Sequence, residues 1–294
     1  MTLKEKVQLK KVEIPNGETI AYREREGGTK NLLLIHGNMT SSKHWDVLIE
    51  KIDPEFKVFA MDMRGFGESS YNQAIYSIKE LSDDIKLFVD EIELYGFSIV
   101  GWSLGAPVCM QFVADYPDYC NRLILLAPGS TRGFAMYAPS SEQRLETFDQ
   151  VKIDPTKVVP TETAYRKKDR AFLKFVYDAV IYTKNQPDPN RYEEYLDDML
   201  TQRNYAETVH ALNQFNISHE HNGLVQGNGL ASSINIPTLV LRGDHDLVIT
   251  EQMTKEILDD IGENARFVEL KDCGHSPLID DLDQLLEVMT EFLD

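Results

Sequence analysis

A serine set between two glycines is the short motif with the clearest chemical meaning in this chain. It lies at Ser103, between Gly101 and Gly105, with an apolar run before it and a helical pattern of apolar residues after it. This order predicts a strand, a sharp turn and a helix, with the serine hydroxyl exposed at the turn. Both flanking positions are expected to need glycine, because a side chain there would collide with the neighbouring strand or helix. The motif therefore predicts a nucleophilic serine.

An ordinary glycine-rich strand–helix turn could show the same five residues, so the serine needs partners elsewhere in the chain. A hydroxyl becomes a good nucleophile only when a base accepts its proton, and the usual base is a histidine oriented by a carboxylate. His275 follows the last expected strand, and Asp246 follows the strand before it. Asp244 is the alternative acid, since residues two apart on an extended segment point the same way.

Apolar runs alternate with helical patterns over most of the chain. Buried parallel strands are predicted at residues 31–35, 56–61, 96–100, 122–126, 237–242 and 265–270, and helices at 42–51, 77–94 and 282–292. Two further strand-like runs, 7–14 and 20–24, flank an Asn-Gly pair that is typical of tight hairpin turns. The alternation predicts an α/β protein with a mostly parallel, doubly wound sheet, in which ligands bind at the carboxyl ends of the strands.

The alternation stops between residues 129 and 233. Helices are predicted there at 170–182, 189–201 and 205–215, among many aromatic residues. We therefore expect a core domain made of residues 1–128 and 234–294, interrupted by a helical cap over residues 129–233.

Five short motifs follow one another in a fixed order. They are HGN at 36–38, DMRGFGES at 62–69, GWSLG at 101–105, GDHD at 243–246 and GHSP at 274–277. Together they resemble the α/β-hydrolase superfamily over nearly the whole chain. The resemblance implies an α/β-hydrolase fold in which Ser103 is the nucleophile, Asp246 rather than Asp244 is the acid, and His275 is the base. It also implies an oxyanion hole formed by the backbone N–H groups of Asn38 and Leu104, and it implies no cofactor.

Within this superfamily, the motifs favour a serine hydrolase that cleaves a carboxylic ester of a small or medium apolar substrate through an acyl-enzyme. Lactone hydrolysis is the nearest alternative, because the HGN loop and GWSLG also resemble enzymes that open acyl-homoserine lactones. Hydrolysis of C–C bonds in aromatic breakdown and a catalytically silent small-molecule receptor are further alternatives. Trp102, Met136 and Tyr137 are predicted to line the substrate pocket.

Composition limits the class of protein. The chain has 294 residues, of which 42% are hydrophobic and 27% charged, as in globular proteins, and its net charge is −18. That charge argues against binding to nucleic acid or to an anionic membrane. No apolar run is long enough to cross a bilayer, residues 1–6 lack the apolar core of a signal peptide, and three cysteines form no disulfide framework. We expect a cytoplasmic monomer or homodimer that acts on a small-molecule ester or lactone.

The remaining polar candidates are assigned structural roles. Asp62 and Arg64 are expected to brace a loop by pairing with the backbone or with each other. His44 and His210 are interpreted as helix-surface or packing residues, and Cys109 and Cys120 as small buried apolar residues. The pair of histidines at 219 and 221 has no further ligands nearby in the sequence, so no metal site is predicted.

Overall fold

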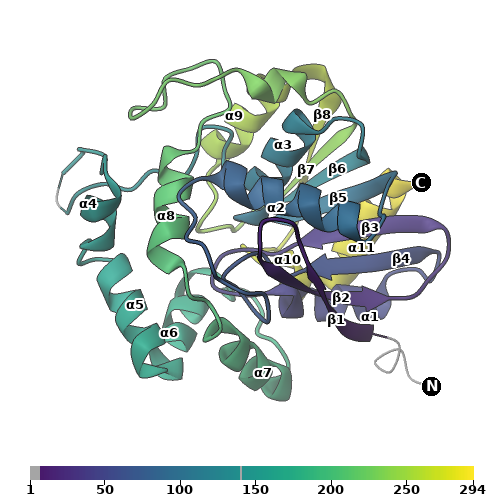
Figure 1. Cartoon of the computed structure of the whole chain (residues 1–294), viewed down its shortest axis with the longest axis horizontal. Coiled ribbons are helices and arrows are strands. Elements are labelled where there is room, and N and C mark those ends of the chain that lie inside the picture. Colours follow the sequence, from purple (N-terminus) through teal and green to yellow (C-terminus); the bar gives the residue numbers. More distant parts are fainter. Residues whose placement is uncertain (1–6, 140) are drawn as a thin grey trace.

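The computed structural model describes residues 7–139 and 141–294; residues 1–6, for which the sequence predicts no signal peptide, lie outside the described part. One sheet of eight strands, in the order β1-β2-β4-β3-β5-β6-β7-β8, forms the centre of the described structure (Figure 1). The strands are β1 (Val7–Glu13), β2 (Thr19–Arg25), β3 (Lys30–Ile35), β4 (Phe56–Met61), β5 (Phe97–Trp102), β6 (Cys120–Leu126), β7 (Thr238–Gly243) and β8 (Ala265–Leu270). The pairs β1–β2 and β2–β4 are antiparallel, and the other pairs are parallel. The α/β class with a mostly parallel sheet is thus confirmed.

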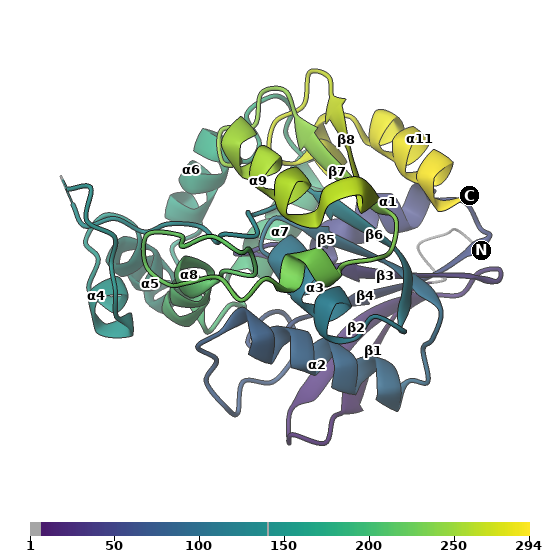
Figure 2. The same cartoon turned by 90° about the horizontal axis from the view of Figure 1, so that it is seen from above.

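The apolar runs of the strands are explained by helices on both faces of the sheet. In β3, Leu33 and Ile35 pack into one core, whereas Leu32 and Leu34 pack into the other. Successive side chains of a strand point to opposite faces, so a strand covered on both sides must be continuously apolar. The first core is covered by α2 (Ile78–Glu91), α3 (Gly105–Asp115) and α9 (Glu251–Ile261), and the second by α1 (Asp46–Lys51), α10 (Pro277–Asp280) and α11 (Leu282–Leu293) (Figure 2).

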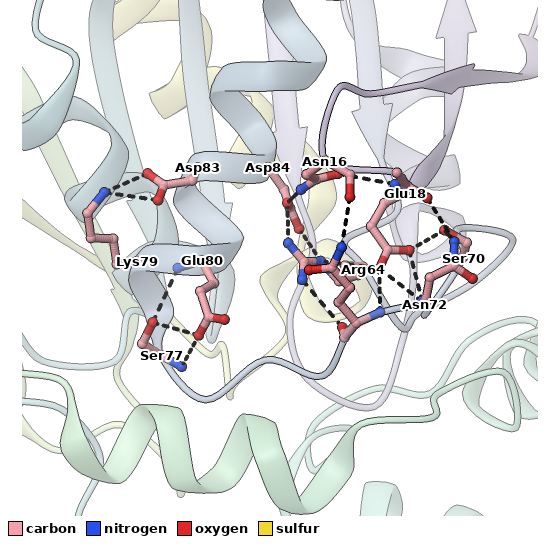
Figure 3. Close-up of polar contacts among 12 residues, drawn as sticks. Asn16, Glu18, Arg64, Ser70, Asn72, Ser77, Lys79, Glu80, Asp83 and Asp84 are labelled. Atoms are coloured by element: carbon pink, nitrogen blue, oxygen red, sulfur yellow. Dashed lines mark hydrogen bonds and ion pairs between the residues drawn. The ribbon is translucent and has the colours of Figure 1, made fainter.

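Helix α2 begins where the sequence predicts it, for a local reason. The Ser77 hydroxyl accepts a hydrogen bond from the Glu80 N–H, and the Glu80 carboxylate accepts one from the Ser77 N–H (Figure 3). This capping box satisfies two backbone donors that a helix start would leave unpaired. The helix predicted at 42–51 is instead a 3₁₀ turn, Ser42–Trp45, followed by α1.

Residues 129–233, which we call the inserted segment, lie between β6 and β7. The segment contains α4 (Phe148–Lys152), α5 (Val158–Lys167), α6 (Arg170–Val180), α7 (Pro189–Met199) and α8 (Tyr205–Gln214), which lie together beside the sheet in both views (Figures 1 and 2). The three helices predicted there are confirmed as α6, α7 and α8, whereas α4 and α5 have no counterpart in the prediction. Asp188 caps α7 by accepting the N–H groups of Asn190 and Arg191, with Pro189 in the first turn.

Candidate active site

Ser103 occupies the sharp turn between β5 and α3. Its φ angle of +53° lies in the left-handed region, which is unfavourable for a residue with a side chain. A Cβ atom on Gly101 would lie 2.4 Å from the Gly105 carbonyl oxygen, and one on Gly105 would lie 2.4 Å from the Ile35 carbonyl oxygen. The predicted steric need for both glycines is thus confirmed. The turn is held by a 3.0 Å hydrogen bond from the Ser103 N–H to the Leu126 carbonyl.

Three side chains that are far apart in the sequence meet at this turn. Nε2 of His275 lies 3.0 Å from Oγ of Ser103, and Nδ1 of His275 lies 3.0 Å from Oδ2 of Asp246 and 3.2 Å from its Oδ1. The histidine and the carboxylate are buried, at 2% and 0% side-chain exposure. They follow β8 and β7, while Ser103 follows β5, so the parallel sheet brings all three to its carboxyl edge.

The surroundings of Asp246 favour its charged form. Burial by itself would raise the pKa of this carboxyl group, but the charge and hydrogen bond of His275 hold the pKa below its ordinary value. The N–H groups of Val248 and Ile249, at 2.7 and 2.9 Å from Oδ1, act in the same direction. An ionised carboxylate at this position can fix the histidine tautomer and stabilise its protonated form.

Asp244, the alternative acid, points elsewhere. Its carboxylate contacts Nδ1 of His245 at 2.7 Å and accepts the Cys273 N–H at 3.3 Å. The expectation that Asp244 and Asp246 point the same way was wrong, because β7 ends at Gly243 and the chain then turns. Only Asp246 of the two contacts His275 in the described structure.

The rings of Trp102 and His44 contact the loop that carries His275. Nε1 of Trp102 donates a 2.9 Å hydrogen bond to the His275 carbonyl, and the His44 ring stacks on Trp102 with ring centres 4.3 Å apart. Nε2 of His44 lies 3.1 Å from Oγ of Ser276, and burial lowers the pKa of His44 to about 3, so this ring is neutral. The sequence left two roles open for His44, a residue on the helix surface or a packing residue. The structure shows that it is a packing residue. No pattern in the sequence around His44 indicates that its ring stacks on Trp102, which lies 58 positions further along the chain.

A cavity of about 240 Å³ opens above Ser103 and His275. Its walls are mostly apolar, and several of them come from the inserted segment: Phe134, Met136, Val176, Val209 and Leu212. Trp102 and Met136, two of the predicted pocket residues, line this cavity. Tyr137, the third predicted pocket residue, does not line this cavity: it is 53% exposed and its backbone bridges to Arg144. Neighbouring residues of an extended segment point in opposite directions, so Met136 and Tyr137 cannot both face inwards.

The two predicted oxyanion donors border the same cavity. Asn38 and Leu104 both line it next to Ser103. Over residues 7–139 and 141–294, no protein acceptor is found for the backbone N–H of either residue. Leu104 immediately precedes the first turn of α3, where backbone N–H groups are unpaired and the helix dipole is positive. Both N–H groups thus lack a protein acceptor within the described residues, and the oxyanion hole stays a prediction.

A family model described as alpha/beta hydrolase fold matches residues 30–282. The chain belongs to this family. Its eight-stranded sheet and the order of its motifs agree with the resemblance stated from the sequence.

Curated relatives of this α/β hydrolase include an uncharacterized protein and a hydrolase. An uncharacterized protein of Mycobacterium bovis is 34% identical over 103 residues, which is 35% of this chain and 30% of that protein, so the chain matches less than a third of that relative's length. A 2-hydroxy-6-oxononadienedioate/2-hydroxy-6-oxononatrienedioate hydrolase of Escherichia coli is 22% identical over 279 residues, covering 93% of this chain and 90% of the relative.

Solved structures share the fold at low identity. An esterase from Exiguobacterium antarcticum has a TM-score of 0.75 at 15% identity, and the enol-lactonase from Burkholderia xenovorans LB400 has a TM-score of 0.72 at 22% identity. Each match covers 97% of this chain and 99% of the other. At these identities the similarity shows the fold alone.

Asp62 and Arg64 in the 62–69 motif of this α/β hydrolase are structural: Asp62 pairs with the backbone, as one of the two expectations had it, whereas the two residues do not pair with each other. Asp62 is buried and accepts the N–H groups of Ser42 and Glu68, at 2.8 and 2.9 Å, which ties two loops together. Arg64 does not pair with Asp62. Its guanidinium forms a two-pronged ion pair with Asp84 of α2 and lies beside Glu18 (Figure 3).

Other candidates lie away from the cavity. His210 is half-buried against the Phe148 ring, with ring centres 5.6 Å apart. His219 and His221 are exposed, and among the residues with described positions no group of three or more metal-ligating side chains is found. The three cysteines are buried free thiols. In the part of the chain that the structure covers, no helix combines the length and the apolar character that crossing a membrane requires.

Proposed function

We propose that this α/β hydrolase cleaves carboxylic esters with a small or medium apolar acyl or alcohol group through an acyl-enzyme on Ser103. The observation that carries the proposal is the 3.0 Å contact between Oγ of Ser103 and Nε2 of His275 at the base of an apolar cavity. Asp246 on the other side of the imidazole completes the arrangement that serine nucleophiles require.

In the acylation half of the proposed reaction, His275 accepts the Ser103 proton through Nε2 while Oγ attacks the ester carbonyl carbon. The carbonyl oxygen becomes an oxyanion, which accepts hydrogen bonds from the backbone N–H groups of Asn38 and Leu104. Asp246 stabilises the imidazolium that forms. The tetrahedral intermediate then collapses, the bond to the alcohol oxygen breaks, and the alcohol leaves with the proton that His275 returns.

In the deacylation half, a water molecule takes the place of the alcohol. His275 accepts one of its protons, and the hydroxide attacks the acyl carbon under the same two N–H donors. Collapse of the second intermediate releases the carboxylic acid and returns the proton to Ser103. No metal or organic cofactor takes part in these steps.

The inserted segment, residues 129–233, is proposed to be a substrate-selecting cap on a core made of residues 1–128 and 234–294. Support comes from the cavity walls, because seven of the apolar residues that line the cavity belong to this segment: Phe134, Met136, Val176, Val180, Ile181, Val209 and Leu212. The free energy of binding becomes more favourable roughly in proportion to the apolar area that a ligand buries. Such walls therefore favour apolar acyl or alcohol groups.

Hydrolysis of a C–C bond is the second candidate, because the Escherichia coli relative aligns with 93% of this chain. The substrate in that relative's name is a dianion. The cavity of the present chain has one lysine, Lys157, among its lining residues, and the rest of the lining is mostly apolar. Two carboxylates would be poorly compensated there, so the cavity favours an uncharged ester or lactone.

The test is turnover of short nitrophenyl esters by the wild type and by Ser103→Ala. We expect a burst of nitrophenol followed by steady turnover in the wild type, and loss of both in the variant. Labelling by a fluorophosphonate should likewise require Ser103. A folded wild type that neither turns over esters nor becomes labelled would favour the receptor alternative, and a panel of lactones and of vinylogous diketones separates the other two reactions.

A further inference from the structure

The loop that carries Asn38 is held by the inserted segment and not only by the sheet. Tyr177 of α6 donates a hydrogen bond to the Met39 carbonyl at 3.1 Å, and Asp198 of α7 accepts the Ser41 N–H at 2.9 Å. Gln202, just after α7, contacts the loop at two points: Oε1 accepts the Met39 N–H at 3.0 Å, and Nε2 donates to Oδ1 of Asn38 at 2.8 Å.

The loop has a conformation that needs such support. Met39 has a φ angle of +61°, in the left-handed region, where a side chain other than glycine is strained. Residues held in this region persist when surrounding contacts impose the conformation. Gln202 binds the peptide directly after Asn38 and also the Asn38 side chain, so it restrains Asn38 on both sides of its Cα and thereby limits how the adjoining peptide, which carries the Asn38 N–H, can rotate.

The amide of Gln202 is itself locked. The side chain is 4% exposed and makes four hydrogen bonds, the remaining two being to Oδ1 of Asn204 at 3.1 Å and from the Tyr165 hydroxyl at 3.0 Å. Its two N–H donors and two acceptor positions are all used, and the Met39 N–H can only face the oxygen of the amide. One orientation of Gln202 therefore satisfies the whole set.

The residues around Gln202 are anchored to a second loop of the core. Nδ2 of Asn204 donates to the Arg64 carbonyl at 2.8 Å, and the Arg203 N–H donates to the Gly65 carbonyl at 2.9 Å. Arg64 is in turn fixed by its ion pair with Asp84 on α2 (Figure 3). Gln202 and the two residues after it therefore connect the Asn38 loop to the loop of the core that carries Arg64 and Gly65.

From these contacts we propose that Gln202 is a positioning residue for the oxyanion hole. It holds the Asn38–Met39 peptide so that the Asn38 N–H faces the oxygen that becomes negatively charged during the reaction. The inference rests on the proposed function, because an oxyanion forms only if Ser103 attacks a carbonyl group. It assigns to the inserted segment a part in catalysis besides shaping the cavity.

The test compares Gln202→Ala with the wild type on a short nitrophenyl ester. We expect kcat to fall by about 10- to 100-fold, less than the loss when an oxyanion donor is removed outright, because the Asn38 N–H is displaced and not deleted. KM should stay within about twofold, since the apolar walls are unchanged. The rate of Ser103 labelling by a fluorophosphonate should fall by a similar factor, because the phosphoryl oxygen occupies the same hole.

Gln202→Glu is the second variant, nearly the same in size. An ionised glutamate can accept the Met39 N–H but repels Oδ1 of Asn38, whereas a protonated glutamate can make both hydrogen bonds. The ratio of the variant's kcat to that of the wild type should therefore rise as the pH is lowered. A residue that only stabilises the fold would not produce this pH signature.

Thr201→Val is the matched control. The Thr201 hydroxyl accepts the Gly67 N–H at 2.9 Å, so this variant removes a contact of the same kind, one residue away, to the other loop. Its kcat and labelling rate should stay within about twofold of the wild type. An active wild type with folded Gln202 variants of equal kcat overturns the positioning role alone. A wild type that neither turns over nor labels overturns the proposed function, and the positioning role with it.

Discussion

The carboxyl edge of the sheet and the inserted segment contribute to the same cavity in different ways. The sheet edge provides Ser103, Asp246 and His275, each within a few residues of a strand end. The inserted segment provides apolar walls and the polar side chains that hold the Asn38 loop. At the sheet edge, positions are set by backbone packing so close that glycine is required, whereas in the segment they are set by side chains.

We expect this difference to place the reaction chemistry mainly at the sheet edge and substrate selection mainly at the cavity walls, with Gln202 as the residue of the inserted segment that acts on the chemistry. Changes at the sheet edge should alter the rate for every substrate or the stability of the fold, because they disturb the reacting groups or the turn that presents them. Changes in the cavity walls should alter which substrate is preferred, and leave the chemistry intact.

The largest effect is expected from the acid at the sheet edge. Asp246→Asn should lower kcat by about 10⁴-fold, because an amide cannot hold His275 in the required tautomer or stabilise its protonated form. Asp244→Asn, two residues away, should retain kcat within about threefold, since Asp244 contacts His245 instead. The measurement is turnover of a nitrophenyl ester by both folded variants. Equal losses in the two would refute the assignment of the acid.

A smaller effect, on stability, is expected at the turn. Gly101→Ala places a Cβ atom 2.4 Å from the Gly105 carbonyl oxygen and should lower the free energy of unfolding by about 3 kcal/mol or more. Gly223→Ala is the control: its φ of +90° strains a side chain, but no atom lies within 4 Å, so the loss should be about 1 kcal/mol. Urea titrations of both variants measure the difference, and similar midpoints would contradict the steric explanation.

In the inserted segment, a neighbouring pair of residues tests the cavity wall. Met136→Ala enlarges the cavity and should shift the ratio of kcat/KM for hexanoate over acetate esters by about 10-fold towards the longer chain. Tyr137→Ala should leave this ratio unchanged, because its side chain lies outside the cavity. A shift of the ratio in the Tyr137 variant would instead restore that residue to the pocket.

The smallest effect concerns the contact between the two regions. Burial and the nearby charge of Asp62 raise the pKa of Asp198 to about 6, although hydrogen bonds from Ser41 and the charge of Arg23 oppose the rise. The folded protein therefore binds this proton more tightly than the unfolded chain does. The stability that this gives is present below about pH 4 and is lost as the pH rises through 6.

Asp198→Asn removes this titration. The free energy of unfolding of the wild type, minus that of the variant, should fall by about 1 kcal/mol from pH 5 to pH 7, because only the wild type loses the stability that comes from the protonated carboxyl group. Denaturant titrations at the two pH values measure it. A difference that stays constant, or that grows with pH, would show that the carboxyl group titrates in its ordinary range.

The sequence by itself determined the fold class, most of the strands and the motif order. Apolar runs of strand length and amphipathic helical patterns are local signals, so β4 and β8 were predicted with the observed bounds. The steric need for Gly101 and Gly105 also followed from the sequence motif, although only the clash at Gly101 is with the same turn; the clash at Gly105 is with Ile35 of β3. The helices α4 and α5, and the split of residues 42–51 into a 3₁₀ turn and a helix, were not predicted, since short elements carry weak periodicity.

The tertiary structure alone decided which side chains face one another. Alternation along a strand would place Asp244 and Asp246 on the same face, so it could not tell them apart, whereas the turn that follows β7 points the two carboxylates in different directions. Likewise, the contacts of His44 with Trp102, and of Gln202 with Asn38, join residues 58 and 164 positions apart in the chain. Such contacts depend on how layers pack, and packing is a property of the whole chain that no short pattern contains.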